Sequence, residues 1–465
     1  MGPFMKNDNS TNKMMCRVLI ALLPIVLFSF YKNGVLCYDG DLITLFKPLM
    51  FIGLSTLFTF IIETTYLYIF TDNKLKDIIK NNYAYMPGLF LGLILPINTP
   101  ISILLVGCFI ATIIGKMLFG GFGKNIFNPA LIGRLFVISM YALTISNLGG
   151  YLNSNEIDAV TSATPLSNMN VIEGIGTYEE LVKPYGTLKD FFLGFIPGCI
   201  GETSSVLIIL AFIYLSLTKT IKWRIPAIYV ATVFIMTFFI GSMNGVGLWY
   251  PVFQILSGGL LFGAVFMATD PVTSPTTKYG QIIYGLCLGI LTVTLRYLTS
   301  YPEGVLTSIL TMNMLVFIID DIGVKIKFNK KKIIIPLTVL MIIGISLIFV
   351  IGNKFKVSQI DTKFEILSSN MSNNIVTYNV SEVGYSSKIK LEIKIKDGEI
   401  LSINVLEQND SFFSKVLNSN YLDTLVNNQK ELDACDTVSG ATISSTAVKK
   451  AVINTLNDYK VNYEK

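Results

Sequence analysis

Long apolar runs separated by short polar breaks occupy most of the first 351 residues of the chain. A helix of about 20 apolar residues is long enough to cross the hydrocarbon core of a bilayer. The pattern therefore predicts eleven membrane-spanning segments. Their approximate bounds are 15–31, 45–70, 83–96, 101–119, 129–146, 191–217, 225–243, 252–269, 280–298, 304–319 and 333–351. The third run, Tyr83 to Pro96, is short and contains glycine and proline, which is typical of a broken helix enclosed by protein.

The last part of the chain, residues 353–465, follows a different pattern. Alternating apolar and polar positions predict three strands, the last two joined at a turn by Asp397-Gly398. These strands are Ile375–Val380, Lys388–Lys396 and Glu399–Leu406. Residues Thr442 to Tyr459 have the periodicity of an amphipathic helix. We therefore predict a small α+β domain attached to the membrane part by the eleventh span.

The composition agrees with a polytopic α-helical membrane protein. Of the 465 residues, 52% are hydrophobic and only 14% are charged, and the mean hydropathy is +0.59. A soluble domain carries about 25% charged residues because its surface faces water. The sequence thus excludes a disordered chain and disfavours an ordinary soluble protein.

The positions of lysine and arginine predict the orientation. They concentrate in alternate breaks, whereas the loop Gly149–Asp190 has two lysines against six acidic residues, a net charge of −4. Positive residues concentrate on the cytoplasmic side, so we predict a cytoplasmic N-terminus and an extracytoplasmic Gly149–Asp190 loop and C-terminal domain. The predicted domains are 1–320 (ten spans, with the outer loop 149–190), 321–352 (a basic cytoplasmic linker and the eleventh span) and 353–465.

The outer loop divides the ten spans into two sets of five. An odd number of spans per set means that the second set enters the membrane inverted relative to the first. Inverted halves commonly form a central pathway near the middle of the membrane. A pathway between the halves is therefore expected.

Several kinds of site are excluded by residue types. The chain has no histidine, which excludes bis-histidine haem, histidine-ligated zinc and Rieske clusters within it. Its six cysteines are far apart and include no C-x-x-C pair, so neither a complete iron–sulfur site nor any other metal site is predicted. The net charge of +5 fits basic cytoplasmic loops and does not indicate a nucleic-acid partner.

A seven-residue pattern, D-x-x-[ST]-[GS]-A-T, occurs twice. The copies are Asp158-Ala159-Val160-Thr161-Ser162-Ala163-Thr164 in the outer loop and Asp436-Thr437-Val438-Ser439-Gly440-Ala441-Thr442 in the C-terminal domain. At average composition such a match is expected about once in 10⁵ starting positions. Each copy offers a hydroxyl among small neighbours, and the helix start at Thr442 offers N–H groups to an oxyanion. The alternative interpretation is that one copy is a helix cap and the other a turn.

The repeated pattern resembles the flavinylation signature of the Rnf and Na⁺-pumping NADH:quinone reductase families. Residues 13–320 look like the RnfD membrane protein of the Rnf complex (NqrB of the reductase), and residues 333–465 look like a shortened RnfG (NqrC). Three sequence segments carry the resemblance of the membrane part. They are Gly120-Gly121-Phe122-Gly123-Lys124-Asn125-Ile126-Phe127-Asn128-Pro129-Ala130, Gly201-Glu202-Thr203-Ser204 and Ala268-Thr269-Asp270-Pro271-Val272-Thr273-Ser274-Pro275. These parts are normally separate subunits, and here they are fused.

The resemblance implies covalent flavin. A flavin transferase would link FMN through its phosphate to Thr164 and to Thr442. The other motif residues would serve recognition by that transferase: Asp158, Thr161, Ser162, Ala163, Asp436, Ser439, Gly440 and Ala441. The regions around Gly120–Gly123 and Asp270 would line the inner pathway or hold a further, non-covalent flavin.

The resemblance also implies a function. The chain would be a redox subunit, incomplete alone, of an ion-translocating ferredoxin:NAD⁺ oxidoreductase in a bacterial cytoplasmic membrane. Its partners would be iron–sulfur and NADH-binding subunits, and it would couple electron flow to Na⁺ or H⁺ movement. An uncoupled extracytoplasmic electron outlet and an inverted-repeat transporter or channel with a ligand-binding outer domain remain as alternatives.

Ionisable residues near the spans are candidates for the ion route because charges are costly in lipid. They are Glu63, Lys116, Arg134, Glu202, Asp270 and Arg296. Glu202 and Asp270 are the preferred candidates, and Glu202 is expected about a third of the way along the sixth span. Lys116 and Arg134 are expected to snorkel or to form local ion pairs.

Overall fold

The computed structural model describes most of the chain as two compact units, one up to Phe355 and one from Phe364 onward. The described residues are 10–38, 40–71, 78–79, 82–147, 165–166, 169, 175–202, 204–299, 304–355, 364–372, 375–384, 388–396, 398–408, 413–427, 432, 438 and 441–463.

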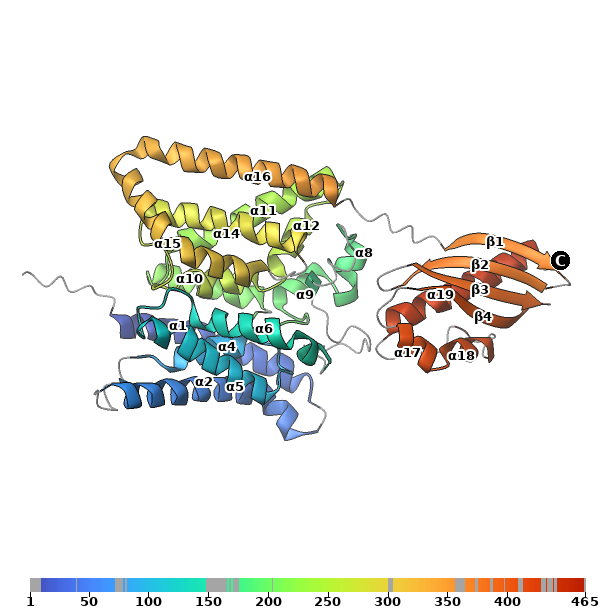
Figure 1. Cartoon of the computed structure of the whole chain (residues 1–465), viewed down its shortest axis with the longest axis horizontal. Coiled ribbons are helices and arrows are strands. Elements are labelled where there is room, and N and C mark those ends of the chain that lie inside the picture. Colours follow the sequence, from blue (N-terminus) through green and yellow to red (C-terminus); the bar gives the residue numbers. More distant parts are fainter. Residues whose placement is uncertain are drawn as a thin grey trace, which may run out of the picture. The chain divides into compact units, whose positions relative to one another are not determined.

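The first unit is a helical bundle (Figure 1). Its first half consists of α1 (Thr11–Phe30), η1 (Tyr31–Val35), α2 (Leu42–Phe70), α4 (Tyr85–Ile94), α5 (Ile101–Phe109), η2 (Ile110–Ile114), η3 (Met117–Phe119) and α6 (Pro129–Asn147). Then follow α8 (Tyr178–Leu181), η4 (Lys183–Tyr185), α9 (Leu188–Leu193), α10 (Ser205–Leu217), α11 (Arg224–Met243), α12 (Trp249–Leu256), α13 (Leu260–Phe262), η5 (Gly263–Met267), α14 (Lys278–Leu298) and α15 (Gly304–Phe328). The last elements of the unit are η6 (Lys330–Ile333) and α16 (Ile334–Lys354).

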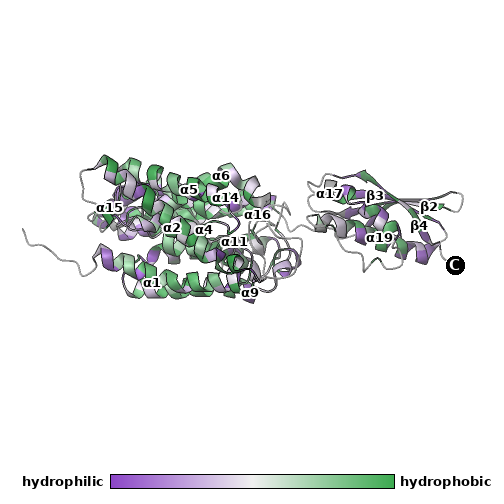
Figure 2. Cartoon of the chain, turned by 90° about the horizontal axis from the view of Figure 1, so that it is seen from below, coloured by the Kyte–Doolittle hydropathy of each residue, from purple (hydrophilic) through white to green (hydrophobic). Residues whose placement is uncertain are grey.

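The helices confirm a polytopic membrane protein. Among the described residues, seven helices are long and apolar enough to cross a membrane, and α12 with α13–η5 forms an apolar pair bent by 63°. Three shorter apolar helices lie at Tyr85–Ile94, Pro129–Ala142 and Ser205–Leu217. Each of the eleven predicted segments overlaps one of these helices or the bent pair. Figure 2 shows the hydrophobic character of the bundle helices.

The sixth predicted segment differs from expectation, because its first part is irregular rather than helical. Helix α9 ends at Gly194 (φ +106°), and α10 begins only at Ser205. The backbone between them is bound by the first half: the Gly201 N–H donates to the Leu93 carbonyl at 2.7 Å, and the Lys32 ammonium donates to the Ile196 carbonyl. The prediction that Glu202 lies within a helical span is therefore wrong, since Glu202 precedes the helix.

The two halves of the bundle pair their helices in the same order. In the first half α2 packs on α4 and α5, and α5 packs on α6; in the second α11 packs on α12 and α14, and α14 packs on α15. Figure 1 shows the blue and teal helices of the first half grouped on one side and the later helices on the other. The corresponding helix is interrupted in both halves, by a turn at 95–100 after α4 and by residues 257–259 after α12.

The second unit is an antiparallel sheet covered by helices. Strands β1 (Glu365–Ser372), β2 (Ile375–Val383), β3 (Lys388–Lys396) and β4 (Glu399–Glu407) pair in sequence order. Helices α17 (Phe413–Asn418), α18 (Tyr421–Asn427) and α19 (Thr442–Asn462) follow. The three predicted strands and the C-terminal helix are confirmed, whereas β1 was not predicted.

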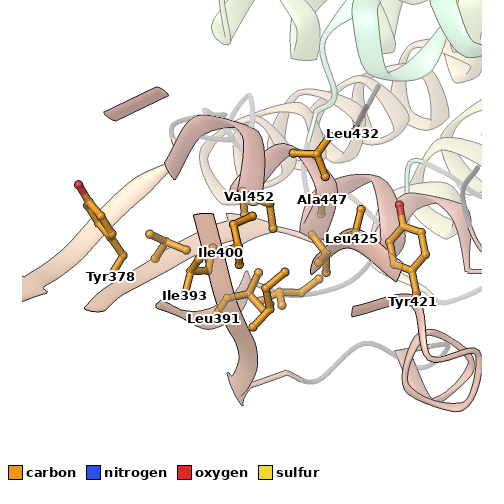
Figure 3. Packing of buried hydrophobic residues seen from close by; sticks show 14 of the residues in the cluster. Tyr378, Leu391, Ile393, Ile400, Tyr421, Leu425, Leu432, Ala447 and Val452 are labelled. Carbon is orange, nitrogen blue, oxygen red and sulfur yellow. The ribbon is translucent and has the colours of Figure 1, made fainter. Parts of the chain in front are cut away.

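The core of this unit lies between the sheet and α19. Strand β3 alternates strictly, with Ile389, Leu391, Ile393 and Ile395 fully buried and its lysines on the other face. Figure 3 shows Leu391, Ile393 and Ile400 of the sheet facing Val452 of α19. This core fixes the start of α19, where the second copy of the repeated motif lies.

Candidate functional site

The repeated motif is only partly among the described residues. The first copy, Asp158–Thr164, lies outside them, as do Asp436, Ser439 and Gly440 of the second copy. Val438 and Ala441 are described, and Thr442 is described as the first residue of α19.

A hydrogen bond between Val438 and Ala441 closes a turn directly before α19. The Ala441 N–H donates to the Val438 carbonyl at 3.0 Å, and the Val438 N–H donates to the Ser445 hydroxyl at 3.2 Å. Ala441 is 5% exposed and belongs to the domain core, against which Val438 also packs. The alanine of the motif is thus a packing requirement, because a longer side chain at this position would overfill the core.

The start of α19 suits a phosphate. The first N–H groups of a helix have no partners within it, and the helix dipole favours an anion there. The residue before the helix, Ala441, provides no capping side chain. Of the described residues, the one directly before the helix thus contributes no side-chain oxygen to its first N–H groups.

The segment directly after Thr164 is anchored in the bundle. Pro165 and Leu166 are buried, and a Cβ atom on Gly258 would lie 2.5 Å from Leu166 Cδ2 and 3.2 Å from Arg296 Nη2. Met169 is 4% exposed, and its sulfur accepts a hydrogen bond from Gln254 Nε2 at 3.0 Å. Leu166 and Met169, which follow Thr164, thus pack on the end of α12 and the interruption between α12 and α13.

A buried guanidinium supports this interruption. Arg296 of α14 is fully buried and donates to the Gln254 carbonyl at 2.6 Å, to Gln254 Oε1 at 3.0 Å and to the Ser257 carbonyl at 3.1 Å. The hydroxyls of Tyr250 and Tyr297 lie 2.5 Å apart beside Gln254. Arg296, one of the ionisable candidates, therefore donates hydrogen bonds to backbone carbonyls at the end of α12 that have no partner within that helix.

Glu202 and Arg134 form an ion pair between the halves. Arg134 lies on α6, and the two side chains are 6% and 7% exposed, Arg134 first. Arg134 Nη2 also donates to Cys199 Sγ at 3.5 Å, and a Cβ on Gly259 would lie 2.6 Å from the Glu202 carboxyl carbon. The expectation of local ion pairs is confirmed for Arg134, and Glu202 is not a carboxylate without a counter-charge.

A second ion pair joins Lys116, which directly precedes η3, to Glu63 of α2. Lys116 Nζ donates to both carboxylate oxygens of Glu63, at 2.7 and 2.8 Å, and to the Asn82 carbonyl at 2.8 Å. The side chains of Lys116 and Glu63 are 3% and 0% exposed. Lys116 also lies over the Phe122 ring, 5.6 Å from its centroid, so the local ion pair expected for Lys116 is confirmed as well.

A cavity of about 290 Å³ adjoins this ion pair. Its lining comes from both halves and includes Tyr83, Lys116, Phe122, Asn128, Thr220 and Asp270. These residues belong to the breaks that the charge pattern assigned to one side of the membrane, so those breaks do meet at one end of the bundle. We call this end the basic end.

Three phenylalanines close the inner limit of this cavity. Phe90 of α4 contacts Phe262 and Phe266, with ring centroids 6.4 and 6.3 Å apart, and Phe262 lies 4.9 Å from Phe266. Phe90 and Phe266 line the cavity, whereas Phe262 lines a void of about 10 Å³ together with Arg134 and Glu202. The interrupted spans of the two halves thus meet between the basic-end cavity and the Arg134–Glu202 pair.

Asp270 lies in the loop after η5, and its carboxylate accepts hydrogen bonds from the Val272 N–H at 3.4 Å and the Thr273 hydroxyl at 3.1 Å. Burial raises the pKa of Asp270, although these hydrogen bonds and Lys222 lower it in part.

Two residues that the sequence analysis missed hold the same loop. Asp320 of α15 accepts from the N–H and hydroxyl groups of Thr276 and Thr277 at 2.7–3.1 Å, and Lys222 Nζ donates to the Pro275 carbonyl at 2.9 Å. An acidic residue near the end of the tenth apolar run was the one available indication of this contact.

Comparisons with known proteins give two family matches, one in each of the two units. Residues 1–329 match the model of the NQR2, RnfD, RnfE family, and residues 384–457 match the model of the FMN-binding domain.

Individual relatives resemble the first part of the chain. The D subunit of the proton-translocating ferredoxin:NAD(+) oxidoreductase complex of Clostridium ljungdahlii is 36% identical over 71% of this chain and 96% of its own length. The D subunit of the Na(+)-translocating ferredoxin:NAD(+) oxidoreductase complex of Acetobacterium woodii is 32% identical over 71% and 93%. The B subunit of the Na(+)-translocating NADH-quinone reductase of Chromohalobacter salexigens is 34% identical over 54% and 60%.

Proposed function

Since the chain belongs to the NQR2, RnfD, RnfE family, we propose that it is the membrane redox subunit of an Rnf-type, ion-translocating ferredoxin:NAD⁺ oxidoreductase. The observation that carries this proposal is the acceptor motif, which occurs once in the part matched by the family model and once within the FMN-binding match. A channel or a simple transporter has no need of two such motifs.

Thr164 and Thr442 each bear FMN through a phosphoester bond. The bound flavins supply one- and two-electron transfer. The chain's own residues position them: the start of α19 accepts the phosphate at Thr442, and Leu166 and Met169 fix the segment that follows Thr164. Asp158, Thr161, Ser162 and Ala163, together with Asp436, Ser439, Gly440 and Ala441, are recognised by the flavin transferase.

A further, non-covalent flavin occupies the basic-end cavity. Ligand cavities of this kind are mostly apolar with a few polar groups that fix orientation. Phe90, Phe122 and Phe266 provide flat apolar walls, while Lys116 and Asp270 provide charged groups in the lining. A flavin ring in this cavity would lie against the interrupted span α4.

The ion route passes between the halves by way of Asp270 and Glu202. The cavity gives access from the basic end to the three phenylalanines, and the Arg134–Glu202 pair lies beyond them. A cation on this route competes with Arg134 for the Glu202 carboxylate, so transport requires that this ion pair opens. The coupling ion is Na⁺ or H⁺, and the names of the relatives include both.

The basic end faces the cytoplasm of a bacterial cell, and the C-terminal domain lies outside the membrane. Electrons reach the chain from iron–sulfur and NADH-binding partner subunits. A subunit that only exports electrons through its flavins is the competing function, and it would move no ion as electrons pass.

The test is the number of covalent flavins. We expect the chain purified with its flavin transferase to carry two FMN groups by intact mass, and each of Thr164→Val and Thr442→Val to carry one. The double variant should show no in-gel flavin fluorescence, and the wild-type chain made without transferase should also lack it. Covalent flavin in the double variant would refute the assignment. Ion uptake by vesicles during electron transfer separates the coupled from the uncoupled function.

A further inference from the structure

We infer that Ser445 is a positioning residue for flavin attachment to Thr442, and that the acceptor motif extends to a serine three residues after each acceptor threonine. The inference rests on the proposed covalent attachment. It goes beyond that proposal because it assigns a role to a residue outside the seven-residue motif.

Ser445 ties the acceptor turn to the first turn of α19. It is fully buried, and its hydroxyl accepts the Val438 N–H at 3.2 Å while its own N–H donates to the Ala441 carbonyl at 2.9 Å. Ser445 is therefore bonded to both ends of the four-residue stretch 438–441. Thr442 follows directly after that stretch, so its backbone position depends on these bonds.

This use of a serine hydroxyl differs from the usual one within a helix. Buried serine and threonine hydroxyls commonly bond to the carbonyl four residues earlier. Thr455 of the same helix does so, since its hydroxyl donates to the Ala451 carbonyl at 2.6 Å. The Ser445 hydroxyl instead accepts from an N–H group seven residues earlier, outside the helix. Its bond thus holds the start of the preceding turn by giving the partly buried Val438 N–H a partner.

The sequence carries the same serine in the other copy. Thr164 is followed by Pro165-Leu166-Ser167, and Thr442 by Ile443-Ser444-Ser445. The shared pattern is therefore D-x-x-[ST]-[GS]-A-T-x-x-S. Ser167 lies outside the described residues, so its role is inferred from the shared position alone.

The attachment step shows why a fixed turn matters. The Thr442 hydroxyl oxygen forms a bond to the FMN-side phosphorus of a flavin dinucleotide, the phosphoanhydride bond breaks, and AMP leaves with the electron pair. The hydroxyl proton passes to a base of the transferase, and no redox change occurs. A turn held in one conformation presents the hydroxyl without further loss of backbone freedom during the reaction.

The experiment measures the rate of flavin transfer to a single site. The full-length chain is made without transferase in a Thr164→Val background and then incubated with the transferase and FAD. Ser445→Ala is compared with Ser445→Thr, which keeps the hydroxyl, and with Thr455→Val, which removes another buried hydroxyl from the same helix. Covalent flavin is followed by in-gel fluorescence and intact mass, and folding of the domain by thermal unfolding.

We expect Ser445→Ala to lower the maximal rate of transfer about tenfold, which corresponds to the loss of one hydrogen bond of ordinary strength. Thr455→Val should transfer flavin within about twofold of the wild-type rate, because its bond does not involve the turn. Ser445→Thr should recover most of the rate. Exchange of the Val438 amide proton should accelerate in Ser445→Ala and not in Thr455→Val.

Failure of the inference and failure of the proposed function give different results. If the Thr164→Val chain takes up no covalent flavin at all, attachment to Thr442 itself is refuted. If it takes up flavin and Ser445→Ala matches Thr455→Val, the positioning role is refuted. In the reciprocal Thr442→Val background, Ser167→Ala should slow transfer to Thr164 similarly, and an unchanged rate would refute the extended motif.

Discussion

The Arg134–Glu202 pair shows that a single carboxylate between the halves can contribute to the stability of the fold as well as to the proposed ion route. A buried carboxylate in an apolar run suggests a cation ligand when only the sequence is known. The structure places a guanidinium against it and a glycine, Gly259, behind it. Glu202 therefore has a structural partner in addition to any transported ion, and its substitution affects stability and transport together.

A double-mutant comparison separates these two effects. Glu202→Gln removes the charge opposite Arg134, and we expect it to lower the free energy of unfolding by about 3–5 kcal/mol, the usual cost of breaking a buried ion pair. Arg134→Gln with Glu202→Gln should recover most of that loss, because two neutral groups replace two charges. Thermal unfolding of the detergent-purified chain measures this.

Transport should not recover with stability. In vesicles with the assembled complex, both the single and the double variant should keep their flavins but move fewer ions per electron than the wild type. Restored transport in the stable double variant would show that Glu202 acts only through folding.

At the scale of elements, the sequence predicts the helices and strands that are defined by apolar runs and by their periodicity. Apolar runs do not distinguish a helix from an irregular segment enclosed by protein, and the stretch 194–202 is held by contacts from η1, α4 and α6 that are distant in sequence. Strand β1 has no clear alternation and is mostly exposed; its pairing with β2 defines it. The two candidate acceptor threonines stand out in the sequence because the motif recurs, whereas the Arg296 contacts span about forty residues and leave no local pattern.

The interruption between α12 and α13 gives a prediction at this scale. Gly258 and Gly245 both have positive φ, +69° and +71°, but a Cβ on Gly258 would meet Leu166 at 2.5 Å whereas one on Gly245 would meet nothing within 4 Å. Alanine at either position should cost about 1–2 kcal/mol of backbone strain. Gly258→Ala should cost about 1–3 kcal/mol more, because Leu166 must move.

Thermal unfolding compares the two variants, and flavin loading of Thr164 in a Thr442→Val background provides the second measurement. Displacement of Leu166 should reduce loading in Gly258→Ala and leave it unchanged in Gly245→Ala. Equal stability and equal loading of the two variants would show that the segment after Thr164 is not anchored at this glycine.

At the scale of the whole molecule, the orientation in the membrane can be tested with single cysteines. In a background without the native cysteines, Ser369→Cys on exposed β1 and Ser154→Cys in the acidic loop should react with an impermeant thiol reagent in intact cells. Lys325→Cys, at an exposed position on α15, should react only after lysis. The opposite labelling pattern would reverse the orientation and contradict the proposed electron path.

The turn before α19 also bears on the order of folding and cofactor attachment. Val438 and Ala441 take their places only when the core of the C-terminal unit has formed, and Ser445 closes the turn only when α19 has begun. With the proposed flavin on Thr442, the transferase would meet its acceptor after this core has formed. Covalent flavin would then mark chains whose C-terminal unit has folded and distinguish them from unloaded chains before assembly.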